Sequence, residues 1–256
     1  MNLTNNTILI TGGGSGIGRG LAEAFHALGN KVIIAGRRQS ALEETTDANP
    51  GMASVTLDIN DPDAIRSFAA EVIELHPTLN VLINNAGITR RENLKDRANP
   101  AEAEAIITTN VLGPIRLTAA LLPHLQKQSR AVIINVSSGL AFVPFPLGPT
   151  YSASKAFLHS YTQSLRFQLK ETSVEVLEII PPYVQTELGG PAQATDPRAM
   201  PLKEYIAETM QILKSQPEAT ENCVEKVKPL RFAEATGSFD KAFQMLGQLS
   251  FDLSQP

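Results

Sequence analysis

Tyr151 and Lys155 stand four residues apart in the segment Tyr-Ser-Ala-Ser-Lys. On a helix, residues at this spacing share a face, so the Lys155 ammonium can reach toward the Tyr151 phenol. A free phenol has a pKa of about 10, and a nearby cation lowers that pKa toward the range useful for acid–base chemistry. An ordinary structural pair on a helix fits the same spacing. Ser138, in Asn-Val-Ser-Ser after a predicted strand, favours a catalytic site, because open α/β sheets bind ligands at the carboxyl ends of their strands.

A glycine-rich segment, Thr11–Gly18 (TGGGSGIG), lies between a predicted strand and a predicted helix. It does not contain the strict G-x-G-x-x-G pattern, but it places glycines at positions 12, 16 and 18. Glycines permit a tight turn and a close backbone approach, and the N–H groups that begin the helix suit a pyrophosphate. A plain glycine-rich turn is the alternative. The position between strand and helix favours a dinucleotide site.

Arg37 and Arg38 follow the second predicted strand, about 20 residues beyond the glycine segment, where a carboxylate would bind an adenosine 2′-hydroxyl. Gly36 leaves that corner without a carboxylate. A guanidinium suits a 2′-phosphate through charge-assisted, bidentate hydrogen bonds. Two solvated arginines at a helix start are the alternative. We expect a preference for NADP(H) over NAD(H).

The pattern of apolar residues predicts the strands and helices that position these residues. Short runs rich in Val, Ile and Leu alternate with helical patterns, which predicts right-handed βαβ units and a doubly wound parallel sheet. Asp61 before Pro62 is typical of a helix N-cap followed by a first-turn proline. The predicted strands are Thr7–Thr11, Lys31–Ala35, Ala53–Ile59, Asn80–Asn84, Arg130–Val136 and Val174–Ile180. Helical patterns include Gly18–Ala27, Pro62–Leu75, Asn110–Leu125 and Tyr151–Glu171.

After Pro181 the alternation stops. The segment 187–215 begins rich in Gly, Pro, Ala and Thr and is expected to be a variable substrate-binding loop or lid, with disorder as the alternative. Helical patterns follow at Leu202–Lys214 and Glu221–Leu230, and no apolar strand is predicted in the last fifty residues. The length of 256 residues favours a single Rossmann-like domain over 1–256.

Bulk properties exclude several other classes of protein. A net charge of −4 with mixed signs argues against a nucleic-acid surface. No continuous apolar run approaches the roughly 20 residues of a membrane span, and the first residues do not resemble a signal peptide. The single cysteine, Cys223, excludes an internal disulfide and favours a cytoplasmic location. The four histidines are scattered, so no metal site is expected.

Taken together, TGGGSGIG, Asn84–Gly87 (NNAG), the Ser-Ser pair and YSASK resemble, in order and spacing, the classical short-chain dehydrogenase/reductase family over about residues 7–187. The resemblance implies a Rossmann-like sheet of about six strands in the order 3-2-1-4-5-6 with helices on both faces. It also implies hydride transfer between a nicotinamide cofactor and a small carbonyl or alcohol substrate.

The resemblance assigns catalytic roles residue by residue. Tyr151 matches the residue that donates or accepts the proton of the substrate oxygen, and Ser138 matches the serine that hydrogen-bonds that oxygen. Lys155 matches the lysine that holds the ribose hydroxyls and lowers the tyrosine pKa. Asn110 matches a helix asparagine that supports a proton relay through water. The cofactor contacts implied in the same way are Gly12, Ser15, Gly16, Ile17, Gly18, Arg37, Arg38, Asp58, Ile59, Asn85, Ala86, Gly87, Tyr151, Lys155, Pro181, Val184 and Thr186.

The sequence departs from the family pattern in two places. Pro182 replaces the usual glycine, which fixes φ and removes an N–H, and the family's seventh strand is not evident. The Pro-Pro-x-Val-x-Thr variant and the segment near Arg231 resemble a DltE-like branch, named for its linkage to a D-alanine transfer operon. That name implies no substrate.

Apolar residues are candidates for the substrate pocket, which predicts a hydrophobic ketone or aldehyde, although core packing explains each of them equally well. They are Leu140, Phe142, Phe145, Tyr183 and Leu188. The resemblance implies a homodimer or homotetramer formed through the predicted helices Asn110–Leu125 and Tyr151–Glu171.

Two rival functions share the fold. A catalytically idle NADP-binding sensor or structural protein would be expected to lack the tyrosine or the lysine. A cofactor-free halohydrin-lyase-like enzyme would be expected to have a degraded glycine loop and an arginine in place of Lys155. The residues present favour the oxidoreductase.

Overall fold

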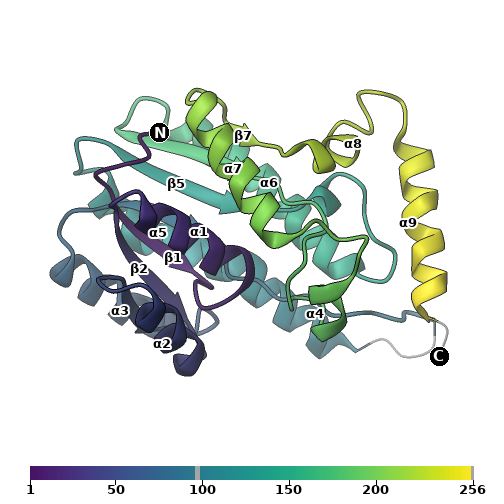
Figure 1. Cartoon of the computed structure of the whole chain (residues 1–256), viewed down its shortest axis with the longest axis horizontal. Coiled ribbons are helices and arrows are strands. Elements are labelled where there is room, and N and C mark those ends of the chain that lie inside the picture. The colour runs from purple at the N-terminus through teal and green to yellow at the C-terminus, as the bar shows by residue number, and fades with distance from the viewer. Residues whose placement is uncertain (96–98, 255–256) are drawn as a thin grey trace.

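A seven-stranded sheet forms the centre of the protein, in the order β3-β2-β1-β4-β5-β6-β7 and with all strands parallel (Figure 1). The computed structural model describes residues 1–95 and 99–254. The strands are β1 (Thr7–Thr11), β2 (Lys31–Gly36), β3 (Ala53–Thr56), β4 (Leu79–Asn84), β5 (Ala131–Val136), β6 (Val174–Ile179) and β7 (Glu221–Asn222).

Helices connect the strands and cover both faces of the sheet (Figure 1). They are α1 (Gly16–Ala27), α2 (Gln39–Ala48), α3 (Pro62–Leu75), α4 (Pro100–Ile107), α5 (Gly113–Leu125), α6 (Pro149–Leu169), α7 (Leu202–Ser215), α8 (Lys228–Arg231) and α9 (Phe239–Ser254). A π-helical turn (Thr108–Leu112) joins α4 to α5, and 3₁₀ turns cover Gly139–Ala141, Pro191–Thr195 and Glu225–Val227.

The strands are apolar on both faces because each face packs against a layer of helices. In β1, Ile8 and Ile10 belong to one core with residues of α1 and α7, whereas Leu9 belongs to a second core with residues of α3, α5 and α6. The side chains therefore alternate between two hydrophobic cores. The predicted doubly wound α/β fold and the order of its first six strands are confirmed.

The prediction of no strand near the C-terminus is wrong, and so is the start of the helix predicted over Glu221–Leu230. Glu221 and Asn222 form β7 beside β6, and a 3₁₀ turn and the short α8 follow. This strand is two residues long and polar, so it carries no hydropathy signal. Its backbone pairing makes it a strand: the N–H of Glu178 donates to Thr220 O and the N–H of Ile180 donates to Asn222 O.

Two further predictions concern where elements end, and one of them is wrong. The third strand stops at Thr56 rather than Ile59, and the N–H of Leu57 still donates to Gly36 O at 2.9 Å. By contrast, α3 has its predicted bounds, and the Asp61 side chain caps it by accepting hydrogen bonds from the N–H groups of Asp63 and Ala64.

Within the described residues, one helical stretch, 100–125, is long and apolar enough to cross a membrane by length and composition alone, and half of its most apolar window is buried within the protein. The sequence reading missed this stretch because small and polar residues interrupt its apolar ones. Leu117, Leu121 and Leu125 of α5 belong to the hydrophobic core beneath β1, β4 and β5, as expected for a core helix.

The predicted loop 187–215 divides into two parts. The irregular part contains the 3₁₀ turn Pro191–Thr195, and the second part is α7, whose Tyr205 and Ile206 are buried. A Cβ added to Gly20 of α1 would lie 2.7 Å from Ile206, so α1 and α7 pack closely. Because α7 is packed against α1, the part of the predicted loop or lid that is free of a long helix is residues 187–201. Residues 96–98 and 255–256 of the predicted domain 1–256 lie outside the described residues.

Candidate active site

The glycine segment connects β1 to α1 by a turn that requires glycine. Gly12 and Gly16 have φ angles of +69° and +52°, in the left-handed region. A Cβ on Gly18 would collide with Gly12 O and with the Asn85 amide nitrogen. Ser15 is the N-cap of α1, but its side chain makes no capping hydrogen bond. Glycine is therefore required where β1, Asn85 and α1 approach each other, and α1 begins here with backbone N–H groups of the kind that bind anions.

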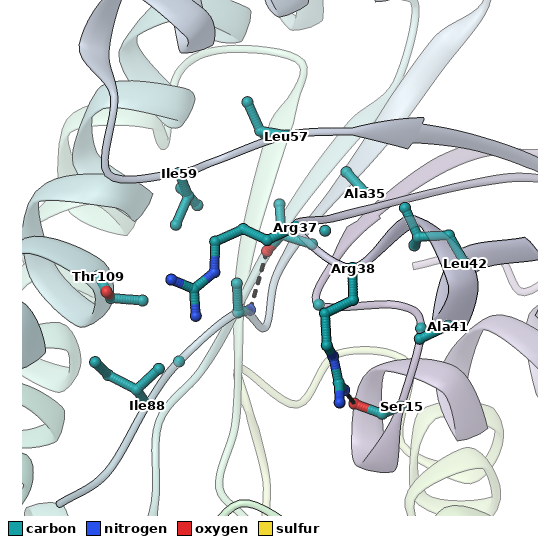
Figure 2. A pocket seen from close by; sticks show the side chains of 16 residues that line it. Ser15, Ala35, Arg37, Arg38, Ala41, Leu42, Leu57, Ile59, Ile88 and Thr109 are labelled. Carbon is teal, nitrogen blue, oxygen red and sulfur yellow. Dashed lines mark hydrogen bonds between the residues drawn. The ribbon is translucent and has the colours of Figure 1, made fainter.

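A cleft lies beside this turn and contains both arginines (Figure 2). The Arg37 side chain extends across the cleft toward Ile59 and Thr109, whereas Arg38 turns toward the glycine segment (Figure 2). The Arg38 Nη2 donates a hydrogen bond to Ser15 Oγ at 3.0 Å. The cleft is lined by Thr11, Gly12, Gly14, Ser15, Ala35, Gly36, Arg37, Arg38, Ala41, Leu42, Leu57, Ile59, Ala86, Gly87, Ile88 and Thr109.

The segment after β4 is fixed to the end of β1. The N–H groups of Asn85 and Ala86 both donate to Thr11 Oγ1 at 3.0 Å, and Asn85 Nδ2 donates to Thr11 O at 2.9 Å. A Cβ on Gly87 would lie 3.2 Å from Asn110 Oδ1 and 3.6 Å from Lys155 Nζ. Gly87 therefore joins the cleft to the predicted catalytic residues.

Ser138 and Tyr151 meet at the carboxyl end of β5. The Ser138 Oγ accepts a hydrogen bond from the Leu140 N–H at 3.1 Å. Tyr151, in the first turn of α6, is 9% exposed. Burial raises the pKa of the Tyr151 phenol to about 12, and a hydrogen bond with Ser138 acts in the opposite direction. Tyr151 is therefore protonated at neutral pH in this geometry.

Lys155 lies one turn further along α6 and is also buried. Its Nζ donates to Val136 O at 2.8 Å and lies 5.8 Å from the centroid of the Tyr151 ring. Burial lowers the pKa of Lys155 to about 8, and the charge of Glu178 opposes that change. The sequence led us to expect that Lys155 would lower the Tyr151 pKa. In the structure burial dominates instead, because it disfavours the charged form of each group.

Asn110 lies in the π-helical turn between α4 and α5, an irregularity often found at functional sites. Its Oδ1 accepts from the Ile88 N–H at 2.8 Å, and its Nδ2 donates to Ile88 O at 2.9 Å and to Ser154 Oγ at 3.0 Å. Ser154 Oγ in turn donates to Tyr151 O at 2.7 Å. Asn110 is thus linked to the helical turn that carries Tyr151.

The segment after β6 returns to the glycine turn. The Thr186 methyl lies beside Gly16, where an added Cβ would be 3.3 Å away. Val184 is buried and pairs with Met200. Pro181 O accepts a hydrogen bond from the Gly139 N–H at 2.9 Å, which fixes the start of this segment despite the proline at 182.

Some predicted residues lie apart from the cleft. The Asp58 side chain is exposed and accepts a hydrogen bond from the Asn60 N–H at 3.0 Å, while its neighbours Leu57 and Ile59 line the cleft. Ile17 packs against the core. Phe142, predicted to line the substrate pocket, contacts the His159 ring edge-on at a centroid distance of 4.7 Å and has the Arg231 guanidinium over its face.

Sequence reasoning missed Thr11, Ile88, Thr109 and Glu92. Thr11 could have been found, because it ends β1 directly before the first glycine. Glu92 carried no signal: its carboxylate accepts hydrogen bonds from the Thr150 N–H at 2.9 Å and from Thr150 Oγ1 at 2.6 Å, a contact across 58 residues. This contact clamps the N-terminus of α6 beside Tyr151.

Comparison with known proteins agrees with this geometry. The short chain dehydrogenase family profile matches residues 6–197, and the chain belongs to the short-chain dehydrogenase/reductase family of oxidoreductases. The resemblance to the DltE-like branch is also confirmed: the oxidoreductase DltE of Bacillus subtilis is 38% identical over 250 residues, covering 96% of this chain and 98% of that protein.

Solved structures of this fold contain nicotinamide cofactors of both kinds. A short chain dehydrogenase from Burkholderia cenocepacia in complex with NADP superposes with a TM-score of 0.79 at 25% identity, over 100% of each chain. A 3-ketoacyl-(acyl-carrier-protein) reductase from Brucella melitensis complexed with NADH gives a TM-score of 0.76 at 27% identity, over 84% of this chain and 93% of that one. The neighbours therefore support a nicotinamide cofactor but do not choose between the two.

Proposed function

We propose that this chain is an NADP(H)-dependent oxidoreductase that moves a hydride between the nicotinamide cofactor and a small carbonyl or alcohol substrate. The main support for the proposal is the position of Gly87. It lines the cleft that contains the two arginines, and it lies next to Asn110 and Lys155. A catalytically idle protein would have no need for both the cleft and these two residues.

The residues present fit a dinucleotide. The left-handed turn at Gly12 and Gly16 leads from β1 into α1, and the N–H groups that begin α1 suit a pyrophosphate. The apolar side chains of Leu57 and Ile59 line the cleft and suit an adenine ring. Thr186, beside Gly16, lies where the segment after β6 can cover the cofactor.

The preference for the phosphorylated cofactor rests on charge. Arg37 and Arg38 face the cleft, and Arg38 is held by Ser15 rather than by a carboxylate. Among the described residues that line the cleft there is no aspartate or glutamate to bind the bare 2′-hydroxyl. An arginine, by contrast, is well matched to a phosphate by its planar set of donors.

A nicotinamide held in this cleft would supply the hydride for reduction, and the chain's own residues would supply the proton and orient the substrate oxygen. Ser138 and Tyr151, hydrogen-bonded to each other, are placed to hold the substrate oxygen between them. Tyr151 is protonated at neutral pH, so it can donate the proton that the oxygen needs during reduction. Lys155 is held by a hydrogen bond to Val136 O, and Asn110 is held by hydrogen bonds to the backbone of Ile88. These contacts keep both side chains in place.

The substrate class is proposed to be a hydrophobic ketone or aldehyde. Leu140 and Phe145 are partly buried near the end of β5, and Tyr183 and Leu188 are 46% and 43% exposed on the segment that follows β6. Residues 187–201 are proposed to close over the substrate. We further propose a cytoplasmic homodimer or homotetramer.

The proposal is tested by titrating the purified protein with NADPH and, separately, with NADH, and then measuring turnover on a panel of ketones and aldehydes. We expect tighter binding of NADPH, and in Arg37→Ala or Arg38→Ala a loss of NADPH affinity of about tenfold or more with little change for NADH. Arg66→Ala is the control, because Arg66 is an exposed arginine of α3 paired with Asp63. Equal affinities in the wild-type protein would contradict the NADP preference, and failure to bind either cofactor would contradict the whole proposal.

A further inference from the structure

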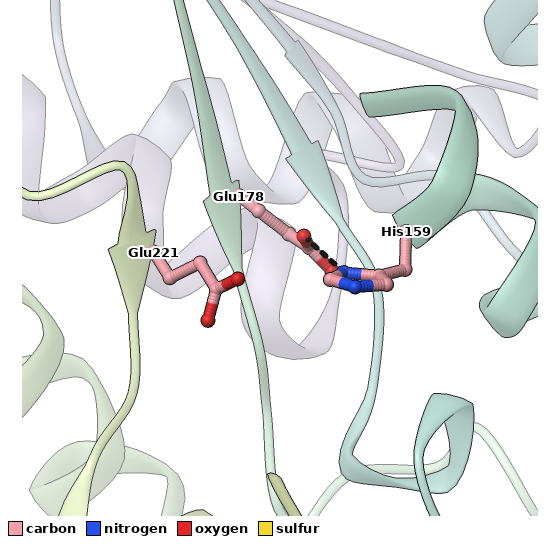
Figure 3. Close-up of side chains that lie close together, drawn as sticks. All are labelled: His159, Glu178 and Glu221. Carbon is pink, nitrogen blue, oxygen red and sulfur yellow. Dashed lines mark hydrogen bonds and ion pairs between the residues drawn. The ribbon is translucent and has the colours of Figure 1, made fainter. Parts of the chain in front are cut away.

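A buried carboxylate contacts the residue that precedes Ser138. Glu178 of β6 is completely buried. Its Oε1 accepts a hydrogen bond from Ser137 Oγ at 2.5 Å, and its Oε2 lies 2.7 Å from His159 Nδ1 (Figure 3). The other ring nitrogen of His159 lies 2.7 Å from Gln163 Nε2. These contacts are all satisfied when His159 donates from Nδ1 to Glu178 and accepts at Nε2 from Gln163. Glu178 then accepts two hydrogen bonds, one from Ser137 and one from His159.

Glu178 is connected to the catalytic residues along two paths. On α6, Tyr151, Lys155 and His159 follow one another at intervals of four residues and so share a face. On the chain after β5, three consecutive residues have separate partners. Val136 O holds Lys155 Nζ, Ser137 Oγ is held by Glu178, and Ser138 is hydrogen-bonded to Tyr151. The Glu178 carboxylate therefore fixes Ser137, and the residues on either side of Ser137 contact Lys155 and Tyr151.

The charges around Glu178 come from three elements. From α6, His159 contacts Glu178 directly, and Lys155 interacts with it through its charge. From the strand on its other side, Glu221 is its register partner in β7, and Cys223 follows. The Arg231 guanidinium of α8 donates to both oxygens of Glu221 at 2.7 and 2.9 Å and so offsets that second carboxylate. The charge of Glu178 raises the pKa of Lys155, in opposition to burial, which lowers it.

A metal site is the alternative use of this cluster, because ligand atoms of His159, Glu178 and Glu221 lie within 4.8 Å of one another (Figure 3). However, each of these groups already has a partner: Gln163 at His159, Ser137 at Glu178 and Arg231 at Glu221. A cation would have to displace the Arg231 guanidinium, and the existing partners suit a hydrogen-bond network better.

We propose that Glu178 is a positioning residue for the reaction: through Ser137 it holds Ser138 toward Tyr151, and its carboxylate is the counter-charge to the buried Lys155 ammonium. The inference rests on the proposed roles of Tyr151 and Lys155. It assigns no contact between Glu178 and the substrate or the cofactor.

The test is the titration of Lys155 itself, which needs no substrate. In protein labelled with ¹³C-lysine, the Cε chemical shift of Lys155, assigned with Lys155→Arg, reports its protonation as pH rises. In Glu178→Gln, which keeps the shape and removes the charge, we expect the midpoint to fall by roughly one pH unit. Glu175→Gln is the matched control: it makes the same change three residues earlier on β6, where Glu175 pairs with Arg130, and should leave the midpoint unchanged.

Ser137→Ala tests the positioning path without removing the charge. We expect kcat with an active ketone to fall about tenfold, while the NADPH dissociation constant and the Lys155 midpoint stay as in the wild type. In Glu178→Gln we also expect the alkaline limb of kcat/KM to move to lower pH. Should Glu178→Gln fail to fold, an unchanged kcat in Ser137→Ala overturns the proposal.

The outcomes separate this inference from the proposed function. Turnover with NADPH, together with an unchanged Lys155 midpoint in a folded Glu178→Gln, overturns the role of Glu178 and leaves the oxidoreductase standing. A lowered midpoint without turnover of any carbonyl supports the electrostatic link and contradicts the proposed function.

Discussion

Tyr151 and Lys155 share one face of α6, and burial moves their pKa values in opposite directions, to about 12 and about 8. Each shift favours the neutral form, which is the usual result of removing water from an ionisable group. The consequence is a phenol that keeps its proton at neutral pH, next to an ammonium that loses its proton more easily than an exposed lysine. This arrangement suits Tyr151 to donate a proton, as the proposed reduction of a carbonyl requires.

The removal of a single hydroxyl tests the role of Tyr151. In Tyr151→Phe we expect kcat to fall by about 10²–10⁴-fold, the usual contribution of a positioned proton donor, while NADPH affinity changes little. Tyr161→Phe is the matched control, because Tyr161 is a partly buried tyrosine of the same helix. Steady-state kinetics and a cofactor titration measure both quantities, and wild-type turnover by Tyr151→Phe would contradict the assignment.

At the scale of the elements, the site depends on where helices begin and where they are irregular. Helix α6 starts at Pro149, directly before Thr150 and Tyr151, and its first turn is held by Glu92 from the segment after β4. The π-helical turn at Asn110 lies between α4 and α5. Neither feature follows from hydropathy, because both depend on partners distant in sequence.

Removing the clamp on α6 is expected to weaken the site. Glu92→Ala removes two hydrogen bonds and a negative charge from the N-terminus of α6, so we expect the free energy of unfolding to fall by about 1 kcal/mol. We also expect kcat to fall more than NADPH affinity, since Tyr151 follows Thr150. Thr150→Ser keeps both donors and serves as the control. Equal urea denaturation midpoints for Glu92→Ala and the wild type would show that α6 starts equally well without the clamp.

At the scale of the whole molecule, buried ionisable groups couple folding to pH. The pKa of Lys155 falls from its ordinary value of 10.5 to about 8 on folding, so between these values the unfolded state binds more protons than the folded state. Stability should therefore rise with pH across this window, by at most roughly 3 kcal/mol from this residue. Above about pH 10 the trend reverses, because Tyr151 ionises more easily in the unfolded chain.

The comparison of wild type with Lys155→Met isolates this effect. We expect Lys155→Met to be the more stable protein near pH 7, with the difference decreasing between about pH 8 and about pH 10.5. Urea denaturation at a series of pH values gives the free energies. A difference that does not vary with pH would show that Lys155 titrates normally in the folded protein.

Self-association of the protein is also a property of the whole molecule. The oligomer is expected to form through residues 110–125 and α6, and large apolar side chains are exposed there: Leu112, Phe157 and Phe167. If these helices form the proposed interface, Phe157→Glu should lower the molar mass measured by sedimentation. Phe232→Glu, at a similarly exposed phenylalanine beyond α8, should not. A wild-type protein that is monomeric at micromolar concentration would exclude the interface.

The sequence by itself determined the parallel sheet, because strands buried on both faces must be continuous runs of Val, Ile and Leu between helical patterns. It also placed Ser138 directly after the fifth strand and put Tyr151 and Lys155 on one face of a helix, and so predicted that these three residues would form one site. The family resemblance added Asn110, whose position in a π-helical turn only the structure shows.

Only the tertiary structure decided the rest. Strand β7 is a polar dipeptide made a strand by its neighbour β6. The exposure of Asp58 follows from the early end of β3. The pKa values depend on how deeply α6 is packed, and Glu178, an ordinary glutamate in the sequence, becomes important because the sheet buries it behind Ser137. These properties arise from contacts between distant residues and from the removal of water, which no local pattern of residues records.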